Sequence, residues 1–225
     1  FSLVMFMFGT RVILPLFNKL TPLPEGELKT AINTYCKSQG YSMTRLFVMD
    51  GSKRSSKANA FFSGLGKSKT IVLFDTLLEK LSTEEIVAVL AHEIGHYKRK
   101  HTLGMLIVSN IQTLAIFSLL GWLLGYHQLS TALGAEKSSF HLSAVTFFIL
   151  LGPLQILLGL INNSFSRRNE FDADQFAKKT FKAQPLAEGL RKISKDALAN
   201  VTPHPLYVAF HYTHPPLAQR IRALK

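Results

Sequence analysis

Two long apolar stretches limit what this chain can fold into more than any other feature of its sequence. Leu103–Tyr126 and Phe140–Ile161 contain no Asp, Glu, Lys or Arg over about 24 and about 22 residues. As helices, each would exceed the roughly 30 Å hydrocarbon core of a bilayer. The short polar link between them predicts a membrane-spanning helical hairpin. Two buried helices of a soluble domain are the alternative, which the polar Asn110 and Gln112 keep open.

Positive charge flanks this predicted hairpin on both sides, at Lys98, Arg99, Lys100, Arg167 and Arg168, while the link holds only Glu136 and Lys137. Loops rich in Lys and Arg stay in the cytosol, so both flanks are expected on the cytosolic side of a bacterial inner membrane or the endoplasmic reticulum. The net charge of +12 would also be compatible with binding to nucleic acid, but the sequence contains no recognisable nucleic-acid-binding module. Membrane lipid, rather than nucleic acid, is the expected partner of this charge.

The remainder is predicted to be mainly α-helical with a small β-sheet. Strands are indicated at Leu46–Met49, Asn59–Ser63 and Ile71–Phe74. The capping-box pattern that begins at Ser82 predicts a helix through His96. Further helices are expected at Glu25–Gln39, Arg168–Phe181, Leu186–Ala199 and from Pro215 towards the last residue. The single Cys36 excludes an internal disulfide and a cysteine-based zinc site.

The residues that carry chemistry begin with His92-Glu93-Ile94-Gly95-His96. Positions four apart share one helix face, so both imidazoles can bind one metal ion. Glu93 then points towards the open coordination position and can act as general base on water. Two nitrogens and a carboxylate oxygen suit zinc. Two solvated histidines are the alternative, but the helix around them is apolar, and unpaired polar groups are costly to bury.

The third metal ligand is expected to be a carboxylate further along the chain. A third histidine at the metzincin spacing would fall on Thr102, which excludes that class. His101 lies on a different helix face and is expected at the membrane interface.

Three downstream glutamates compete for that position. Glu170 is preferred, because Glu136 lies in the outward loop and Glu188 in an ordinary amphipathic stretch. Asp174 shares the face of Glu170 and can accept a hydrogen bond from a ligand histidine. Asp172 points elsewhere and is expected to be solvated.

Together these motifs resemble peptidase family M48, and more closely its Ste24-type CaaX prenyl protease branch. The similarity rests on the two motifs above and on longer strings at residues 21–26, 51–56, 59–62, 71–78 and 211–216. It implies an integral-membrane zinc metalloendopeptidase with a zincin-like catalytic domain joined to the hairpin. It also implies one Zn²⁺ per chain, bound by His92, His96 and Glu170. The long insert of eukaryotic members is missing before Ser82, which suggests a compact prokaryotic member.

The resemblance assigns further roles. His214 would stabilise the oxyanion, and Arg220 would hold a substrate carboxylate or orient the site. Asn59, Ala60 and Phe61 would lie on an edge strand that pairs with the substrate backbone. The substrate would be a peptide or protein, with or without a C-terminal lipid; the oligomeric state stays open.

The expected organisation has four parts. Residues 1–20 are the end of a cut-off transmembrane helix, and residues 21–102 the first catalytic part with the zinc helix. Residues 103–161 form the hairpin, and 162–225 the second catalytic part with the third ligand. An HtpX-type quality-control protease and a non-enzymatic membrane scaffold are the alternative functions.

Overall fold

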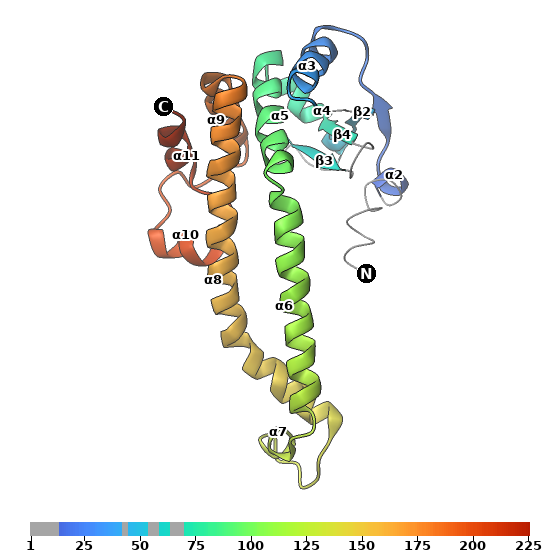
Figure 1. Ribbon diagram of the computed structural model, residues 1–225, viewed down its shortest axis with the longest axis vertical. Coiled ribbons are helices and arrows are strands. Elements are labelled where there is room, and N and C mark those ends of the chain that lie inside the picture. The colour runs from blue at the N-terminus through green and yellow to red at the C-terminus, as the bar shows by residue number, and fades with distance from the viewer. Residues whose placement is uncertain (1–13, 42–44, 54–58, 64–69) are drawn as a thin grey trace. The chain divides into compact units, whose positions relative to one another are not determined.

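The computed structural model describes residues 14–41, 45–53, 59–63 and 70–225, and its chain forms two compact units (Figure 1). The first unit comprises Phe1–His101, Arg168–His204 and Pro215–Lys225, as far as these are described; the second comprises Thr102–Arg167 and Pro205–His214. Most of the expected helix end at residues 1–20 lies outside the described residues. Of these residues the structure describes 14–20, where Leu14–Phe17 form the short helix α2 and Leu20 begins a strand, so the expected helix end stays a prediction.

A four-stranded sheet in the order β1-β2-β4-β3 forms one layer of the first unit. The strands are β1 Leu20–Pro22, β2 Arg45–Met49, β3 Ala60–Ser63 and β4 Thr70–Phe74. Strand β2 pairs with β4 in parallel, and β1 and β3 add to the outer sides antiparallel. The three predicted strands are confirmed to within one residue. Strand β1 was missed because it is three residues long and contains proline, which is typical of an edge strand.

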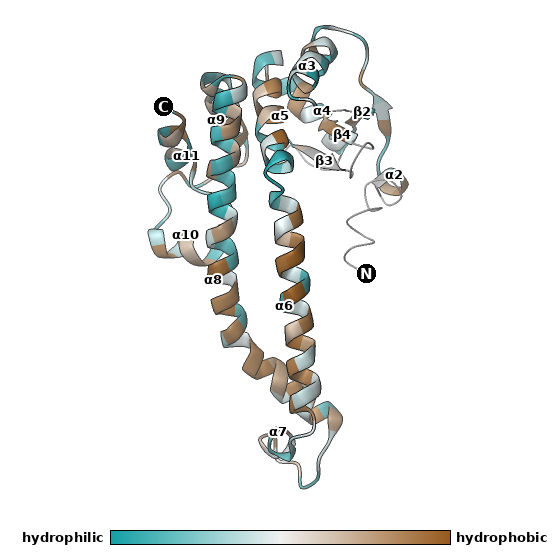
Figure 2. Ribbon diagram, viewed as in Figure 1, coloured by the Kyte–Doolittle hydropathy of each residue, from teal (hydrophilic) through white to brown (hydrophobic). Residues whose placement is uncertain are grey.

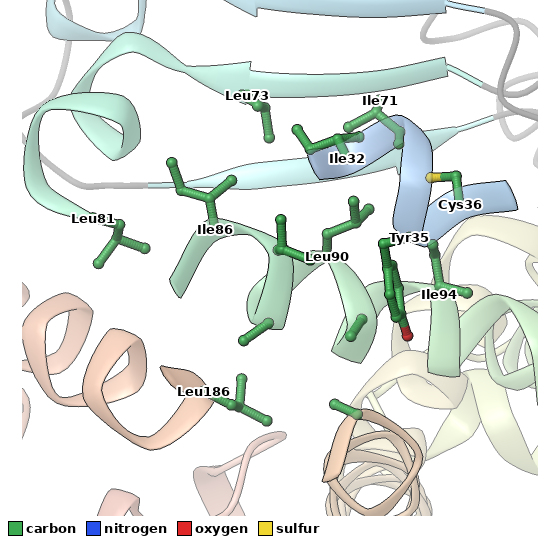
Figure 3. Packing of buried hydrophobic residues seen from close by; sticks show 14 of the residues in the cluster. Ile32, Tyr35, Cys36, Ile71, Leu73, Leu81, Ile86, Leu90, Ile94 and Leu186 are labelled. Carbon is green, nitrogen blue, oxygen red and sulfur yellow. The ribbon is translucent and has the colours of Figure 1, made fainter. Parts of the chain in front are cut away.

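The sheet and several helices share one apolar core (Figure 3). The helices are α3 Glu27–Ser38, α5 Thr83–Lys98, α9 Ala183–Asp196 and α11 Leu217–Leu224, with α4 Asp75–Lys80 and the 3-10 turn Gly51–Lys53 beside β4. Ile71 and Leu73 of β4 contribute to the same cluster as Ile86, Leu90 and Ile94 of α5. The face of α5 opposite the metal motif is thereby anchored in the core.

The capping box of α5 fixes where that helix begins. The Ser82 hydroxyl accepts from the Glu85 amide at 3.3 Å, and the Glu85 carboxylate accepts from the Ser82 amide at 2.8 Å. Lys192 of α9 donates to the same carboxylate at 2.8 Å. The helix start predicted from the sequence is confirmed, and it sets the register that carries His92 and His96 onto one face.

The second unit contains the apolar helices, coloured mainly brown in Figure 2. They are α6 His101–Leu123 and the first part of α8 Phe140–Thr180, joined through α7 His127–Thr131; α10 Pro205–His211 belongs to the same unit. The most apolar windows of α6 and α8 are 0% and 17% buried. A core helix of a soluble domain would be mostly buried, so these exposed faces, long enough to cross a membrane, favour the membrane hairpin.

Reciprocal hydrogen bonds join the two apolar helices. Gln112 of α6 and Asn162 of α8 exchange amide hydrogen bonds at 3.1 Å in both directions. Asn110 instead donates to the Leu106 carbonyl of its own helix. Gln112 is therefore satisfied by a partner on the neighbouring helix and Asn110 by its own helix, as polar side chains in membrane helices are.

Helix α8 differs from the sequence prediction in its length. Two helices were expected, Phe140–Ile161 and Arg168–Phe181, but one helix runs from Phe140 to Thr180. The intervening residues contain neither glycine nor proline, so nothing ends the helix there. Pro153 lies within its apolar part, where neighbouring helices can satisfy the freed backbone carbonyl.

Candidate metal centre

Three donor groups of the first unit converge on one point. His92 and His96 lie one turn apart on α5, and Glu170 lies on α8. The two Nε2 atoms are 3.1 Å apart. The Glu170 carboxylate approaches them at 3.5 Å from His92 Nε2 and 3.3 Å from His96 Nε2. Among the described residues this is the group of donors able to bind a metal ion.

These separations fit a tetrahedral zinc ion. Ligand atoms about 2.0–2.1 Å from zinc at tetrahedral corners lie about 3.3–3.4 Å from one another. The two Nε2 atoms, 3.1 Å apart, are close to that value, and each has one of the two Glu170 oxygens at a similar distance, Oε2 at 3.5 Å from His92 and Oε1 at 3.3 Å from His96. Three protein ligands leave the fourth corner open, which is the pattern of a catalytic rather than a structural zinc site.

Asp174 orients the first ligand. It is fully buried, and its Oδ1 lies 2.8 Å from His92 Nδ1. A carboxylate can only accept, so Nδ1 donates and Nε2 is left to bind the metal. Burial lowers the pKa of His92, but hydrogen bonds to Asp174 and Glu170 outweigh it and raise that pKa to about 9, so a metal ion that binds Nε2 would displace the proton there.

Arg220 of α11 neutralises the buried carboxylates. Its Nε and Nη2 donate to Asp174 at 2.8 and 2.6 Å, and its Nη1 lies 3.2 Å from Glu170. Burial raises the pKa of Asp174, yet hydrogen bonds from Arg220 and His92 hold it below the ordinary value. Because His92 Nδ1 already donates to Asp174, the 3.3 Å approach of Arg220 Nη2 to that nitrogen is a contact, not a hydrogen bond.

For Arg220 the sequence analysis gave two roles, binding a substrate carboxylate or orienting the site, and the alternative of an exposed charge on a helix. The exposed-charge alternative is wrong, because Arg220 is only 8% exposed. Of the two roles, its contacts support orientation of the site. Contact with a substrate carboxylate stays a prediction.

Glu93 lies between the two histidines in sequence and is partly buried. Burial raises its pKa, while charge on His92 and His96 lowers it, and the net shift is upward. A general base gains from a pKa near the working pH, so this environment suits the predicted role.

Gly95 permits the close approach of α5 to α8. A Cβ there would lie 3.2 Å from the Ala173 backbone and from Phe176 Cβ, whereas one at Gly189 of α9 would meet its neighbours at 3.6 Å or more. Alanine favours a helix over glycine by about 1 kcal/mol. We expect Gly189→Ala to raise the unfolding midpoint. Gly95→Ala should instead lower the free energy of unfolding by about 1–3 kcal/mol through overpacking, and with it the midpoint and the zinc content.

Thermal unfolding and elemental analysis of Gly95→Ala and Gly189→Ala measure this difference. Equal stabilisation by the two substitutions would show that the contact between α5 and α8 is not tight at Gly95.

The structure adds contacts beside His96 that the sequence analysis did not predict. His101, expected at the membrane interface, has its Nδ1 3.1 Å from His96 Nδ1. Asp172, expected in solvent, has its Oδ2 3.2 Å from His101 Nε2 and 3.6 Å from Arg99 Nε. The prediction assumed one continuous helix, but α5 ends at Lys98 and Lys100 has a positive φ of 58°, which turns His101 back.

The predicted substrate-binding residues lie on β3 and just before it. In the described part of the chain β3 pairs only with β4 and so forms an edge. The exposed Asn59 accepts from the Phe74 amide at 3.1 Å through its carbonyl. The Ala60 amide donates to the Asn59 side chain at 2.9 Å. Phe61 pairs with Val72, and its side chain lies outside the described part.

The other candidates lie elsewhere. Glu188 pairs with Arg191 at 2.6 Å on α9, as its ordinary surface position suggested. His214 belongs to the second unit and is exposed, with its Nδ1 3.0 Å from the Thr213 hydroxyl. Its role at the oxyanion stays a prediction.

Residues 22–225 match the model of peptidase family M48. The chain belongs to this family. The M48 chain is 41% identical over 228 residues to CAAX prenyl protease 1 of Saccharomyces cerevisiae, covering 94% of this chain and 50% of that relative. It is 38% identical over 263 residues to the Mus musculus homolog, covering 100% and 55%. The crystal structure of S. mikatae Ste24p matches with a TM-score of 0.91 at 40% identity, covering 100% of this chain and 56% of that one.

The M48 chain thus spans about half the length of the curated relatives it matches. Membership implies a bound metal, and together with the apolar helices it indicates a membrane protein. The inference of a prokaryotic member rested on a wrong premise. The yeast alignment of 228 residues leaves no room for a long insert, whereas the mouse alignment of 263 residues does.

Proposed function

We propose that this chain is the catalytic part of an integral-membrane zinc metalloendopeptidase of the CaaX prenyl protease type. One Zn²⁺ per chain would be held by His92, His96 and Glu170. The observation that carries the proposal is the convergence of three donor groups: two Nε2 atoms 3.1 Å apart, each with a Glu170 oxygen within 3.5 Å, and a buried carboxylate on His92 Nδ1. When bound there, zinc supplies a Lewis acid that polarises a carbonyl and acidifies water.

The protein groups divide the remaining chemistry between them. Glu93 removes a proton from the attacking water as its oxygen bonds to the scissile carbonyl carbon. His214 donates a hydrogen bond to the carbonyl oxygen as negative charge develops. The carbon–nitrogen bond then breaks, and Glu93 passes the proton to the departing amine. The products are a carboxylic acid and an amine, and transfer of the acid's proton to the amine leaves a carboxylate and an ammonium group.

The substrate is proposed to bind as an added strand on β3. An edge strand offers main-chain donors and acceptors to an extended peptide. The position of β3 beside β4 alone, within the described residues, supports this. Asn59, Ala60 and Phe61 would then supply its backbone partners.

The site is proposed to face the cytosol. Lys98, Arg99 and Lys100 precede the hairpin, and Arg167 and Arg168 follow it, on the flanks that the positive-inside rule keeps in the cytosol. Arg167 also donates to the Tyr212 carbonyl at 2.7 Å, so part of this charge has a local structural role. A C-terminally prenylated protein reaches such a site from the cytosolic membrane surface.

Zinc content and peptide hydrolysis test the proposal together. We expect one zinc per chain in the wild type, loss of that zinc in Glu170→Ala, and cleavage of a farnesylated CaaX peptide that phenanthroline inhibits. Glu188→Ala is the matched control, a glutamate outside the donor group, and should retain both.

The alternatives give different results. Equal cleavage of farnesylated and unprenylated peptides would favour an HtpX-type quality-control protease. Folded protein without zinc would overturn the proposal and favour a non-enzymatic membrane scaffold.

A further inference from the structure

His96 is connected through His101 to Asp172 by a chain of close polar contacts. His96 Nδ1 lies 3.1 Å from His101 Nδ1, and His101 Nε2 lies 3.2 Å from Asp172 Oδ2. The two imidazole rings meet edge to face, with centroids 5.1 Å apart. The His101 side chain is 11% exposed and the Asp172 side chain 39%.

The direction of these hydrogen bonds follows from Asp172, the last group in this series of contacts. The Asp172 carboxylate can only accept, so His101 Nε2 carries a proton and donates it. His101 Nδ1 is then the acceptor in a neutral ring, and His96 Nδ1 must be the donor. With its proton on Nδ1, His96 presents the lone pair of Nε2 to the metal position.

We propose that His101 and Asp172 are positioning residues that hold His96 in its metal-binding tautomer and ring orientation. The inference rests on the proposed zinc site and adds two residues to its support. It gives each ligand histidine its own carboxylate. His92 donates directly to the buried Asp174, whereas His96 reaches the more exposed Asp172 through an intervening imidazole.

The backbone turn before His101 makes this arrangement possible. Lys100 adopts a φ of 58°, a conformation unfavourable for a residue with a side chain, and it lies between the end of α5 and the start of α6. Without that turn His101 would continue the α5 helix five positions beyond His96, on another face. The turn instead brings the His101 ring back onto His96.

The test measures zinc affinity of the full chain in detergent by competition with a chelator of known affinity. Loss of a hydrogen-bonded partner of a ligand histidine typically weakens metal binding about 10- to 100-fold. We expect His101→Phe, which keeps a ring but no acceptor, to weaken zinc binding by that factor. His101→Asn retains an amide oxygen near the Nδ1 position and should recover most of the affinity.

A double substitution separates this His96–His101–Asp172 hydrogen-bond series, the relay, from a general packing effect. Asp172→Ala alone should weaken zinc binding. Added to His101→Phe, it should weaken zinc binding no further. In cobalt-loaded protein, His101→Phe should also change the visible ligand-field spectrum. His127→Phe and Asp196→Ala are matched controls, an exposed histidine and an ion-paired surface aspartate, and should bind zinc normally.

The outcomes divide clearly. Wild-type zinc affinity in folded His101→Phe, or equal losses in His101→Phe and His101→Asn, would overturn the relay and leave the proposed function intact. Additive effects of His101→Phe and Asp172→Ala would also overturn it. Absence of zinc binding in the wild type would overturn the proposed function and the relay with it.

Discussion

Glu93→Gln should reduce the rate of peptide hydrolysis by about 10²- to 10⁴-fold, the usual contribution of a general acid–base group. Glutamine has nearly the same shape but cannot take a proton from water or return one to the amine. It is not among the three donors, so zinc content should stay at one per chain. The fall should appear in kcat rather than KM, because the proton moves only in the transition state.

Glu84→Gln is the matched control on the same helix. Glu84 is exposed in the first turn of α5, where its carboxylate pairs with Lys182 at 2.7 Å. The same loss of charge there should leave hydrolysis unchanged. Hydrolysis that survives in Glu93→Gln with zinc bound would remove Glu93 from the proposed role and leave the metal assignment standing.

The donor set could be predicted because each part of it is a local pattern. His92 and His96 are one turn apart, and the capping box at Ser82 sets the start of their helix. Glu170 and Asp174 are likewise one turn apart on α8. Helical spacing then decides which side chains share a face, without knowledge of the tertiary fold.

The parts that sequence did not predict depend on a turn or on a distant segment. His101 reaches His96 only because Lys100 leaves the helical conformation, and no glycine marks that position. Arg220 reaches Asp174 across 46 positions of sequence, a pairing that spacing alone cannot reveal. A histidine and an aspartate near a predicted metal motif, otherwise unassigned, were the available signal for the relay.

Arg220→Met should destabilise the protein by about 3–5 kcal/mol, the cost of leaving a buried charge without its partner. Asp174 is fully buried and receives two hydrogen bonds from Arg220, and Glu170 lies 3.2 Å from the same guanidinium. Methionine fills much of the volume but supplies no charge. We expect a lower unfolding midpoint and weaker zinc binding, since His92 is oriented by Asp174.

The pH dependence of this loss has a definite sign. A carboxylate whose pKa is lowered by folding contributes stability above its unfolded pKa, and this stability is lost as pH falls through the folded value. Arg220 is the main partner that lowers the pKa of Asp174 against the effect of burial. Without it that pKa rises, so the deficit of Arg220→Met should be full at neutral pH and smaller in acid.

Arg222→Met tests whether the effect belongs to the buried pair. Arg222 lies on the same helix, α11, and is exposed, so its substitution should change the midpoint little. Arg220→Lys should recover only part of the loss, because an ammonium group cannot make both hydrogen bonds with the geometry of a guanidinium. If Arg220 mainly bound a substrate carboxylate, Arg220→Met would raise KM and leave the unfolding midpoint unchanged at every pH. A buried guanidinium that neutralises two carboxylates beside a metal position predicts the opposite: stability and zinc affinity fall together, even when no substrate is present.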